Sequence, residues 1–373
     1  MIGLDRARIS IKKINIPPEQ LKFNILNKFS IRGDIKTSNG EKIYIGDHEG
    51  IDKVFKFINF IKIGLKNQLC SIEIEFNYAK YYRNTNFELM KTQKEKEDVD
   101  LSILIILSEI TEIDISKMTY EYSFLEVAEQ LEIKRFTDYT NVIYLIYRAL
   151  HLNKDFKKSG KVFYDYSSIL DRFFTTGFVF SFKDGLTLET YNKSLENNEK
   201  TLYESDKATK SSMRNEFKFT KTILKNIFGS SAVESLKLNV LREQISERIG
   251  LSIKNAVIEQ LKKNQLEIEK RLDSLDNLTP RNIQLFVAEN NEWILDYDWF
   301  NCILKNKLSN KKSERMIRIC QKTARDKLVA LEKSNSPKRS NTKNIKRLEQ
   351  YLRVLFGIKL EIKLTKNGEI QVF

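Results

Sequence analysis

The chain has 373 residues, of which 41% are hydrophobic and 31% are charged, and its formal net charge is +14. This composition excludes a disordered chain, and the length suits two or three domains. No run of about 18 uncharged apolar residues appears, and the N-terminus MIGLDRARIS lacks an apolar signal core. Three cysteines without CxxC spacing fit a reducing compartment. We therefore expect a cytoplasmic protein with no membrane contact.

The positive charge is concentrated near the end of the sequence. Residues 301–373 hold 19 Lys and Arg against 6 Asp and Glu, a net charge of +13, so the first 300 residues carry about +1. Charge asymmetry of this kind indicates a polyanionic partner, most often nucleic acid. The alternative is a solvated surface of a lysine-rich protein.

The first part of the chain mixes strand and helix patterns. Alternating polarity predicts strands at 7–16 and 70–78, and residues 29–46 form a predicted hairpin with its turn at Ser38-Asn39-Gly40. Apolar spacing predicts a helix within 49–67. The charged run 92–100 is predicted to be a loop.

The pattern continues through residue 221. Residues 115–122 are predicted as a strand, and residues 123–133 as a helix capped by Ser123 with Glu126 at its third position. A further helix is predicted at 138–152, whereas 101–110 fits either a buried helix or a strand. Four more strands are predicted, at 161–166, 176–182, 185–192 and 213–221.

The remainder is predicted to be mainly helical. Residues 221–275 have few helix breakers, and four helices follow, at 279–290, 297–307, 312–333 and 342–356. A terminal β-hairpin completes an outline similar to a winged helix. The predicted fold class is therefore α+β, an antiparallel sheet flanked by helices and followed by a basic helical domain. The predicted boundaries are 1–225 for the α+β domain, 226–276 for a helical connector and 277–373 for the basic domain.

One helix carries the clearest candidate nucleic-acid surface. Within residues 311–332, four cations fall in an arc of about 80° at 100° per residue, and apolar residues occupy the opposite side. These cations are Arg315, Arg318, Lys322 and Arg325. A row of cations suits a phosphate backbone. Lys338, Arg339, Lys346 and Arg347 are predicted to extend it.

A second candidate site lies on two predicted strands. Alternation places Glu189, Tyr191 and Lys193 on one strand face, and Arg214, Glu216 and Lys218 on a face of another. If the strands are neighbours, the two glutamates offer oxygen ligands for Mg²⁺ or Mn²⁺. Tyr191 then becomes a candidate nucleophile and Lys193 a stabiliser of charge on phosphate. The alternative is a half-exposed sheet with cross-strand ion pairs, which needs no metal.

Other chemistries lack their residues. The only histidines are His48 and His151, so no His-hydrophobic-His pair exists, and neither a P-loop nor a GxGxxG sequence occurs. An NTPase or a dinucleotide-dependent enzyme is therefore not expected.

Three segments together resemble the replication initiation proteins of filamentous-type phages and small plasmids. They are the opening MIGLDRARISI, the segment TTGFVFSFKDGLTLETYNKS and the segment MRNEFKFTK. The family pairs a strand ending in Tyr-Asn-Lys with a later Arg-x-Glu strand, here Tyr191-Asn192-Lys193 and Arg214-Asn215-Glu216. The resemblance implies an antiparallel sheet flanked by helices and rolling-circle initiation, in which a tyrosine nicks DNA and stays attached to the 5′ phosphate. Tyr191 is the expected nucleophile, with Tyr144, Tyr147 and Tyr164 open.

Two other classes of function stay open at this stage. A protein of a mobile element with an inactive site would act by binding DNA or RNA, or by docking on a host nucleoprotein, as an anti-CRISPR-like inhibitor of an RNA-guided nuclease does. A winged-helix transcriptional regulator is the third class, and it would need a dimer. The sequence does not define the oligomeric state.

Overall fold

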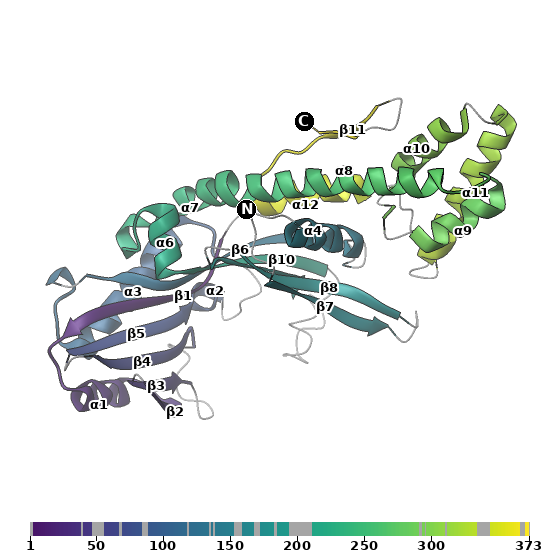
Figure 1. The fold of residues 1–373 in the computed structure, drawn as a ribbon. Helices are drawn as coiled ribbons and strands as arrows, with labels where there is room; N and C mark the ends of the chain where they lie inside the picture. The colour runs from purple at the N-terminus through teal and green to yellow at the C-terminus, as the bar shows by residue number, and fades with distance from the viewer. Residues whose placement is uncertain are drawn as a thin grey trace.

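The computed structural model describes most of the chain (Figure 1). Outside the described residues lie 1–2, 39, 47–55, 67–68, 84–88, 118, 134–135, 137–138, 153–158, 168–171, 183–184, 194–210, 291–292, 295, 310–311, 334–343, 366–369 and 373. His48 is therefore not described. Within the described ranges, none of the helices combines the length and apolar character that a bilayer crossing requires.

A single antiparallel sheet of ten strands organises residues 3–220 in the order β2-β3-β4-β5-β1-β6-β10-β9-β8-β7. The strands are β1 (Gly3–Ile14), β2 (Ile31–Thr37), β3 (Gly40–Ile45), β4 (Ile58–Lys66), β5 (Leu69–Asn77), β6 (Glu121–Ile133), β7 (Ser159–Ser167), β8 (Arg172–Ser181), β9 (Thr187–Asn192) and β10 (Ser211–Thr220). The long strands β1 and β6 lie at its centre and join the two halves.

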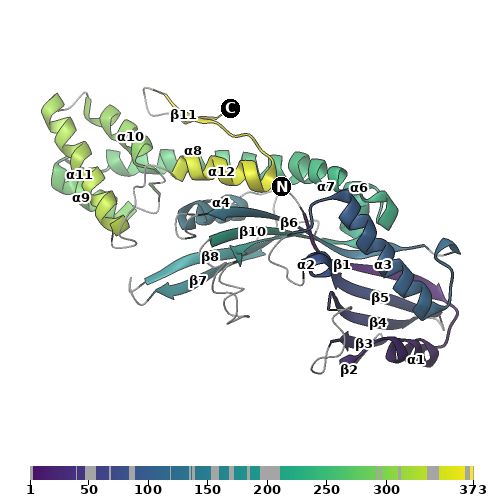
Figure 2. The same ribbon diagram turned by 180° about the vertical axis from the view of Figure 1, so that it is seen from behind.

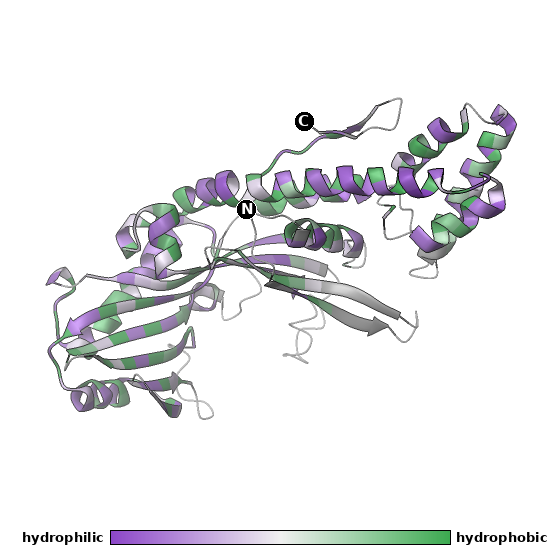
Figure 3. Cartoon of the chain, viewed as in Figure 1, coloured by the Kyte–Doolittle hydropathy of each residue, from purple (hydrophilic) through white to green (hydrophobic). Residues whose placement is uncertain are grey.

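The two faces of this sheet differ in polarity. Alternation along β1 and β5 sends isoleucines such as Ile9 and Ile74 to one side, where they are fully buried. Figure 3 shows this alternation along the strands. The helices α1 (Pro18–Lys28) and α3 (Gln93–Thr111) pack on the apolar side of the first half, and Figure 2 shows α3 in front of β1 and β5. The opposite face carries the charged side chains.

The second half of the sheet is covered on the same apolar side by α4 (Thr140–Leu152) and α12 (Asn344–Phe356). The ring of Phe217 on β10 contacts that of Phe356 on α12 at 5.8 Å between centroids. Short helices α2 (Tyr78–Arg83) and α6 (Lys221–Phe228) follow β5 and β10. The α+β fold class predicted from the sequence is confirmed.

A long helical segment connects the sheet to the C-terminal helices. The helix α7 (Leu238–Gln244), a π-helical turn (Ile245–Gly250) and α8 (Leu251–Asp273) follow one another without a break. At the far end of α8, α11 (Glu314–Lys333) packs against α9 (Pro280–Asn290) and α10 (Tyr297–Ser309) (Figure 1).

The terminal hairpin, β11 (Ile362–Leu364) and β12 (Ile370–Val372), is present as predicted, but β12 contacts α8. Between α11 and the hairpin, α12 returns to β6 and α4 because its buried Leu348, Leu352 and Leu355 face the sheet. The elements of the predicted winged helix therefore do not pack together. The helices α9, α10 and α11 contact one another, whereas α12 lies on the sheet.

The predicted capped helix at 123–133 is wrong, because these residues form most of β6. Val127 and Leu125 lie on the apolar face, and both are fully buried between β1 and β10. The capping pattern lies elsewhere: Thr92 and Glu95 form a capping box at the start of α3, so the predicted loop at 92–100 is also wrong.

Two other local predictions need correction. Within 49–67, residues 58–66 form β4, since Phe60, Lys62 and Gly64 alternate with the buried Ile61 and Ile63 between two partner strands. Pairing on both sides outweighed the helical spacing. The strand predicted at 115–122 begins only at Glu121. The ambiguous run 101–110 is helical, as part of α3.

Candidate active site

The two strands that carry the candidate residues are neighbours. In the register of β9 and β10, Glu216 lies opposite Glu189 and Arg214 lies opposite Tyr191. All four side chains therefore belong to the polar face of the sheet. The sequence analysis expected these side chains to come together if the two strands were neighbours, and β9 and β10 are neighbours.

Tyr191 contacts the two groups expected to assist a nucleophile. Its hydroxyl donates a hydrogen bond to Oε1 of Glu216, and Nζ of Lys193 lies 3.4 Å from the hydroxyl oxygen. Lys193 is 1% exposed, whereas the Tyr191 ring is half-buried. A carboxylate that accepts the phenol proton and an ammonium beside the oxygen are suited to activating a tyrosine.

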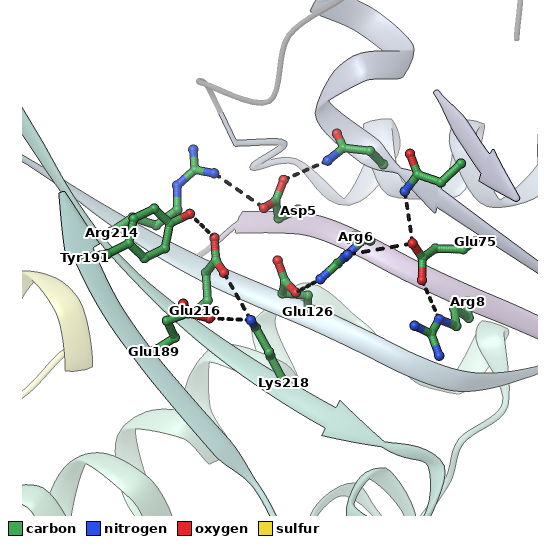
Figure 4. A network of polar contacts seen from close by, with 12 residues as sticks. Asp5, Arg6, Arg8, Glu75, Glu126, Glu189, Tyr191, Arg214, Glu216 and Lys218 are labelled. Carbon is green, nitrogen blue, oxygen red and sulfur yellow. Dashed lines mark hydrogen bonds and ion pairs between the residues drawn. The ribbon is translucent and has the colours of Figure 1, made fainter. Parts of the chain in front are cut away.

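Glu216 belongs to a cluster of three buried carboxylates (Figure 4). Asp5 on β1 and Glu126 on β6 each bring a carboxylate oxygen that lies, like that of Glu216, within 4.8 Å of the others. The three residues are 2–5% exposed. Asp5 reaches this position because the register between β1 and β6 shifts between Leu4 and Arg6, which is a β-bulge.

Two arginines and the amide of Asn77 hold the carboxylates in place, and the amide of Gln130 holds one of these arginines. Nη2 of Arg6 donates to Oε2 of Glu126 at 2.8 Å, and Nη1 of Arg214 lies 3.4 Å from Oδ2 of Asp5. Asn77 Nδ2 donates to the other oxygen of Asp5 at 2.9 Å. Arg214 is fully buried and also donates to Gln130 at 2.9 Å. The cluster is therefore fixed in position by contacts from four strands.

Glu189, which the sequence predicted as a metal ligand together with Glu216, does not lie in the carboxylate cluster. Its carboxylate accepts a hydrogen bond from Nζ of Lys218, which lies 3.8 Å from Glu216. Of the two metal ligands expected from the sequence, Glu216 thus lies in the carboxylate cluster and Glu189 lies beside it, next to a lysine. The structure adds Asp5 and Glu126 to the candidate ligands.

Burial and mutual repulsion perturb the cluster. Burial, together with the charges of Glu216 and Asp5, raises the pKa of Glu126 to about 8, although Arg6 opposes the shift. Burial and the charge of Asp5 also raise the pKa of Glu216, opposed by the hydrogen bond from Tyr191. Without a further cation, Glu126 therefore keeps a proton at neutral pH. Carboxylates with raised pKa values are typical of functional sites.

The donor set fits a small divalent cation. Mg²⁺ prefers carboxylate oxygens at about 2.0–2.1 Å, so its ligand oxygens lie at most about 4.2 Å apart, and the larger Ca²⁺ allows about 5 Å. The 4.8 Å limit on the cluster needs only small side-chain movements to match Mg²⁺ or Mn²⁺. Asp5, Glu126 and Glu216 are the residues that would hold the ion, and its charge would replace the proton on Glu126.

The predicted basic row lies on α11. Arg315, Arg318, Lys322 and Arg325 are all exposed, while Ile317, Cys320, Ala324 and Leu328 are buried on the opposite side. Two of the four cations have neighbours that the sequence pattern did not suggest. Arg318 Nη2 lies 3.6 Å from Glu314, and the Arg325 guanidinium lies 5.7 Å from the centre of the Tyr297 ring.

The predicted extensions of this row lie elsewhere. Lys338 and Arg339 lie outside the described residues. Lys346 is exposed on α12, where Arg347 donates to Asn344 at 2.9 Å. The helix α12 packs against the sheet, whereas α11 packs against α9 and α10. Lys346 and Arg347 therefore do not continue the row of cations on α11.

The sequence pointed to Glu216 but missed Asp5 and Glu126. Glu126 was assigned to a helix cap, and recognising β6 as a strand would have placed it on the polar face. For Asp5 no local signal exists, because an alternating strand with a bulge looks the same in sequence as one without. No protein-family model matches the chain, and no curated protein is significantly similar to it.

Proposed function

We propose that this is a nucleic-acid-binding, replication-initiator-like protein of a phage or plasmid, which cleaves a DNA strand through Tyr191 and acts in the cytoplasm. One observation carries the proposal. The Tyr191 hydroxyl is hydrogen-bonded to Glu216, a member of the Asp5–Glu126–Glu216 cluster, with the Lys193 ammonium 3.4 Å from the same hydroxyl.

The residues of the chain have separate roles in such a cleavage. Glu216 accepts the phenolic proton as the Tyr191 oxygen attacks the phosphorus. A phosphotyrosine bond to the 5′ phosphate forms, the bond from phosphorus to the 3′ oxygen breaks, and this oxygen leaves as a 3′ hydroxyl by taking a proton from solvent, while Glu216 keeps the phenolic proton until it is released to water. Lys193 stabilises negative charge on the phenolate and on the phosphate. A bound Mg²⁺ or Mn²⁺ would supply Lewis acidity at the scissile phosphate.

Binding would be separate from cleavage. The exposed cations of α11, Arg315, Arg318, Lys322 and Arg325, provide phosphate contacts without base specificity. This arrangement supports separate roles, in which α11 contacts nucleic-acid phosphates and the sheet provides the residues that cleave the strand.

One observation favours a second candidate. The polar face contains several complete ion pairs, such as Lys218 with Glu189 and Arg6 with Glu126, and such pairs also stabilise sheets that have no catalytic role. In this reading the protein needs no metal and works by binding nucleic acid or a host nucleoprotein, as an anti-CRISPR-like inhibitor or a winged-helix regulator would.

The deciding experiment is a nicking assay on supercoiled and single-stranded DNA with Mg²⁺ or Mn²⁺. We expect a covalent protein–DNA adduct that Tyr191→Phe abolishes. Tyr147→Phe is the matched control, because Tyr147 lies on α4 and stacks on His151 over the apolar face of the sheet. An adduct that persists in Tyr191→Phe, or no adduct with any substrate, would refute the assignment.

A further inference from the structure

The polar face does not end at the carboxylate cluster. Register along β1 places Arg8, Ser10 and Lys12 on the same face as Arg6, running away from the cluster. Adjacent strands add Lys62 on β4 and Lys42 on β3. From Arg6 to Lys12 this row covers about 20 Å, at about 3.3 Å per residue.

Aromatic rings lie between these cations. The Arg8 guanidinium lies 5.0 Å from the centre of the Phe124 ring and 5.4 Å from that of Phe60, and its Nε is 2.5 Å from Glu75. Lys42 Nζ lies 3.7 Å from the centre of the Phe60 ring. The Arg8 side chain nevertheless remains 36% exposed. A partly exposed guanidinium beside aromatic rings offers a surface on which a nucleobase can stack.

A cavity lies next to this row. Its volume is about 580 Å³, within the range of about 300–1,000 Å³ typical of ligand sites. The polar lining includes three lysines, hydroxyl groups and one carboxylate: Lys12, Lys62, Lys221, Ser10, Ser123 and Glu73. Glu73 accepts a hydrogen bond from Ser123, and Lys221 is paired with Glu121 at the rim.

The charged side chains around this cavity indicate the class of ligand that it binds. Among the described residues on the polar face of β1, β3, β4 and β5, five cations face two carboxylates. They are Arg6, Arg8, Lys12, Lys42 and Lys62 against Glu73 and Glu75, apart from Asp5 of the carboxylate cluster. The two parts of the polar face thus differ, since the carboxylate cluster would attract a cation and the adjoining area would attract an anion. Alternating positive charge and aromatic rings on a sheet suit a flexible single strand better than a stiff duplex.

We infer that the polar face of β3, β4, β5 and β1, with its cavity at Lys12 and Lys62, binds the single-stranded DNA that leads to the carboxylate cluster. Lys12 and Lys62 contact phosphates, and Arg8 supports a base. The inference rests on the proposed function for the choice of DNA, but its test does not depend on cleavage.

The test measures the affinity of the full-length protein for a fluorescent oligothymidylate of about 20 nucleotides by anisotropy, in EDTA and over a series of salt concentrations. The test variant is Lys12→Glu with Lys62→Glu. The matched control is Lys94→Glu with Lys262→Glu, two exposed lysines on α3 and α8, on the covered side of the sheet. Lys12→Gln with Lys62→Gln serves as the neutral version, and circular dichroism verifies folding.

Loss of two phosphate contacts from a single strand lowers the slope of log affinity against log salt by about 1.4. We expect this change in both test variants, with a loss of affinity of about tenfold or more at low salt, and no change in the control. An unchanged salt slope in a folded variant would overturn the inference. An equal loss of affinity for duplex DNA, or a larger loss of affinity for oligouridylate, would also overturn it. Absence of nicking with the slope change present would refute the proposed cleavage alone.

Discussion

Removing any bound metal and raising the pH should weaken the fold, and Glu126 sets the size of the effect. In the folded protein the pKa of Glu126 is about 8, against an ordinary value near 4.5, mainly because the carboxyl is buried beside Glu216 and Asp5. Between these two pH values the folded protein holds a proton that the unfolded chain has released. The free energy of unfolding therefore falls as the pH rises through this window.

The magnitude follows from linkage. Between pH 6 and pH 8 a pKa raised from 4.5 to about 8 removes about 2 kcal/mol of stability. Glu216 shifts in the same direction and adds to the decline. A divalent cation reverses it, since it takes the place of the proton, and at a concentration 100 times its Kd it contributes about 2.7 kcal/mol.

The assay is urea unfolding at pH 6, 7 and 8 in EDTA and with Mn²⁺, followed by circular dichroism. Tryptophan fluorescence is less suitable, because Trp293 and Trp299 both lie among the C-terminal helices. Glu126→Gln should flatten the pH dependence, whereas Glu189→Gln, a carboxyl outside the cluster, should retain it. Equal stability of the unmutated protein at pH 6 and pH 8 in EDTA would refute the reasoning about burial. No gain from Mn²⁺ or Mg²⁺ at pH 8 would refute the metal site.

Three further outcomes are expected from other parts of the molecule. Replacing the four exposed cations of α11 by glutamate should lower polyanion affinity and the slope of log affinity against log salt, and it should leave the circular dichroism spectrum unchanged because none of the four is buried; an unchanged slope would exclude α11. Lys193→Met should reduce adduct formation more than oligonucleotide affinity, and a parallel loss of both would indicate a binding role instead. Lys96→Met should cost about 3–5 kcal/mol in urea unfolding, because it leaves Asp100, whose pKa burial raises, without its partner at 2.6 Å; a cost below about 1 kcal/mol would show that the tyrosines alone satisfy Asp100.

The fold was largely predictable where two signals agreed. The hairpin within 29–46 was predicted from alternation together with turn residues, and its two strands pair; the alternating strands with Tyr191 and Glu216 also pair with each other. Errors arose where one local signal stood alone. Ser123 and Glu126 match a capping box, but a capping box stabilises a helix by only about 1 kcal/mol, which the pairing of β6 with two strands exceeds.

The site was only half predictable for a geometric reason. Glu216, Glu189 and Tyr191 come together through one pair of adjacent strands, and the spacing of residues in each strand shows which face they share. Asp5 joins Glu216 from a strand two positions away and more than 200 residues earlier in the chain, and only the bulge turns its side chain to the polar face. A bulge arises from pairing between strands, so no property of residues 3–14 alone reveals it.

The burial of Arg214 indicates that the cluster has a role besides cross-strand ion pairing. A fully buried arginine bonded to Asp5 and Gln130 is costly to desolvate, and an apolar residue would fill the same place on the sheet without that cost. Ion pairing does not explain why three carboxylates are held within 4.8 Å of one another, because burial and then their mutual repulsion raise the pKa of Glu126 and Glu216 at the expense of stability. A cation bound between them would remove that repulsion, and Arg214 and Arg6 would then orient the ligands. Proteins retain such unfavourable arrangements where a ligand or a reaction requires them.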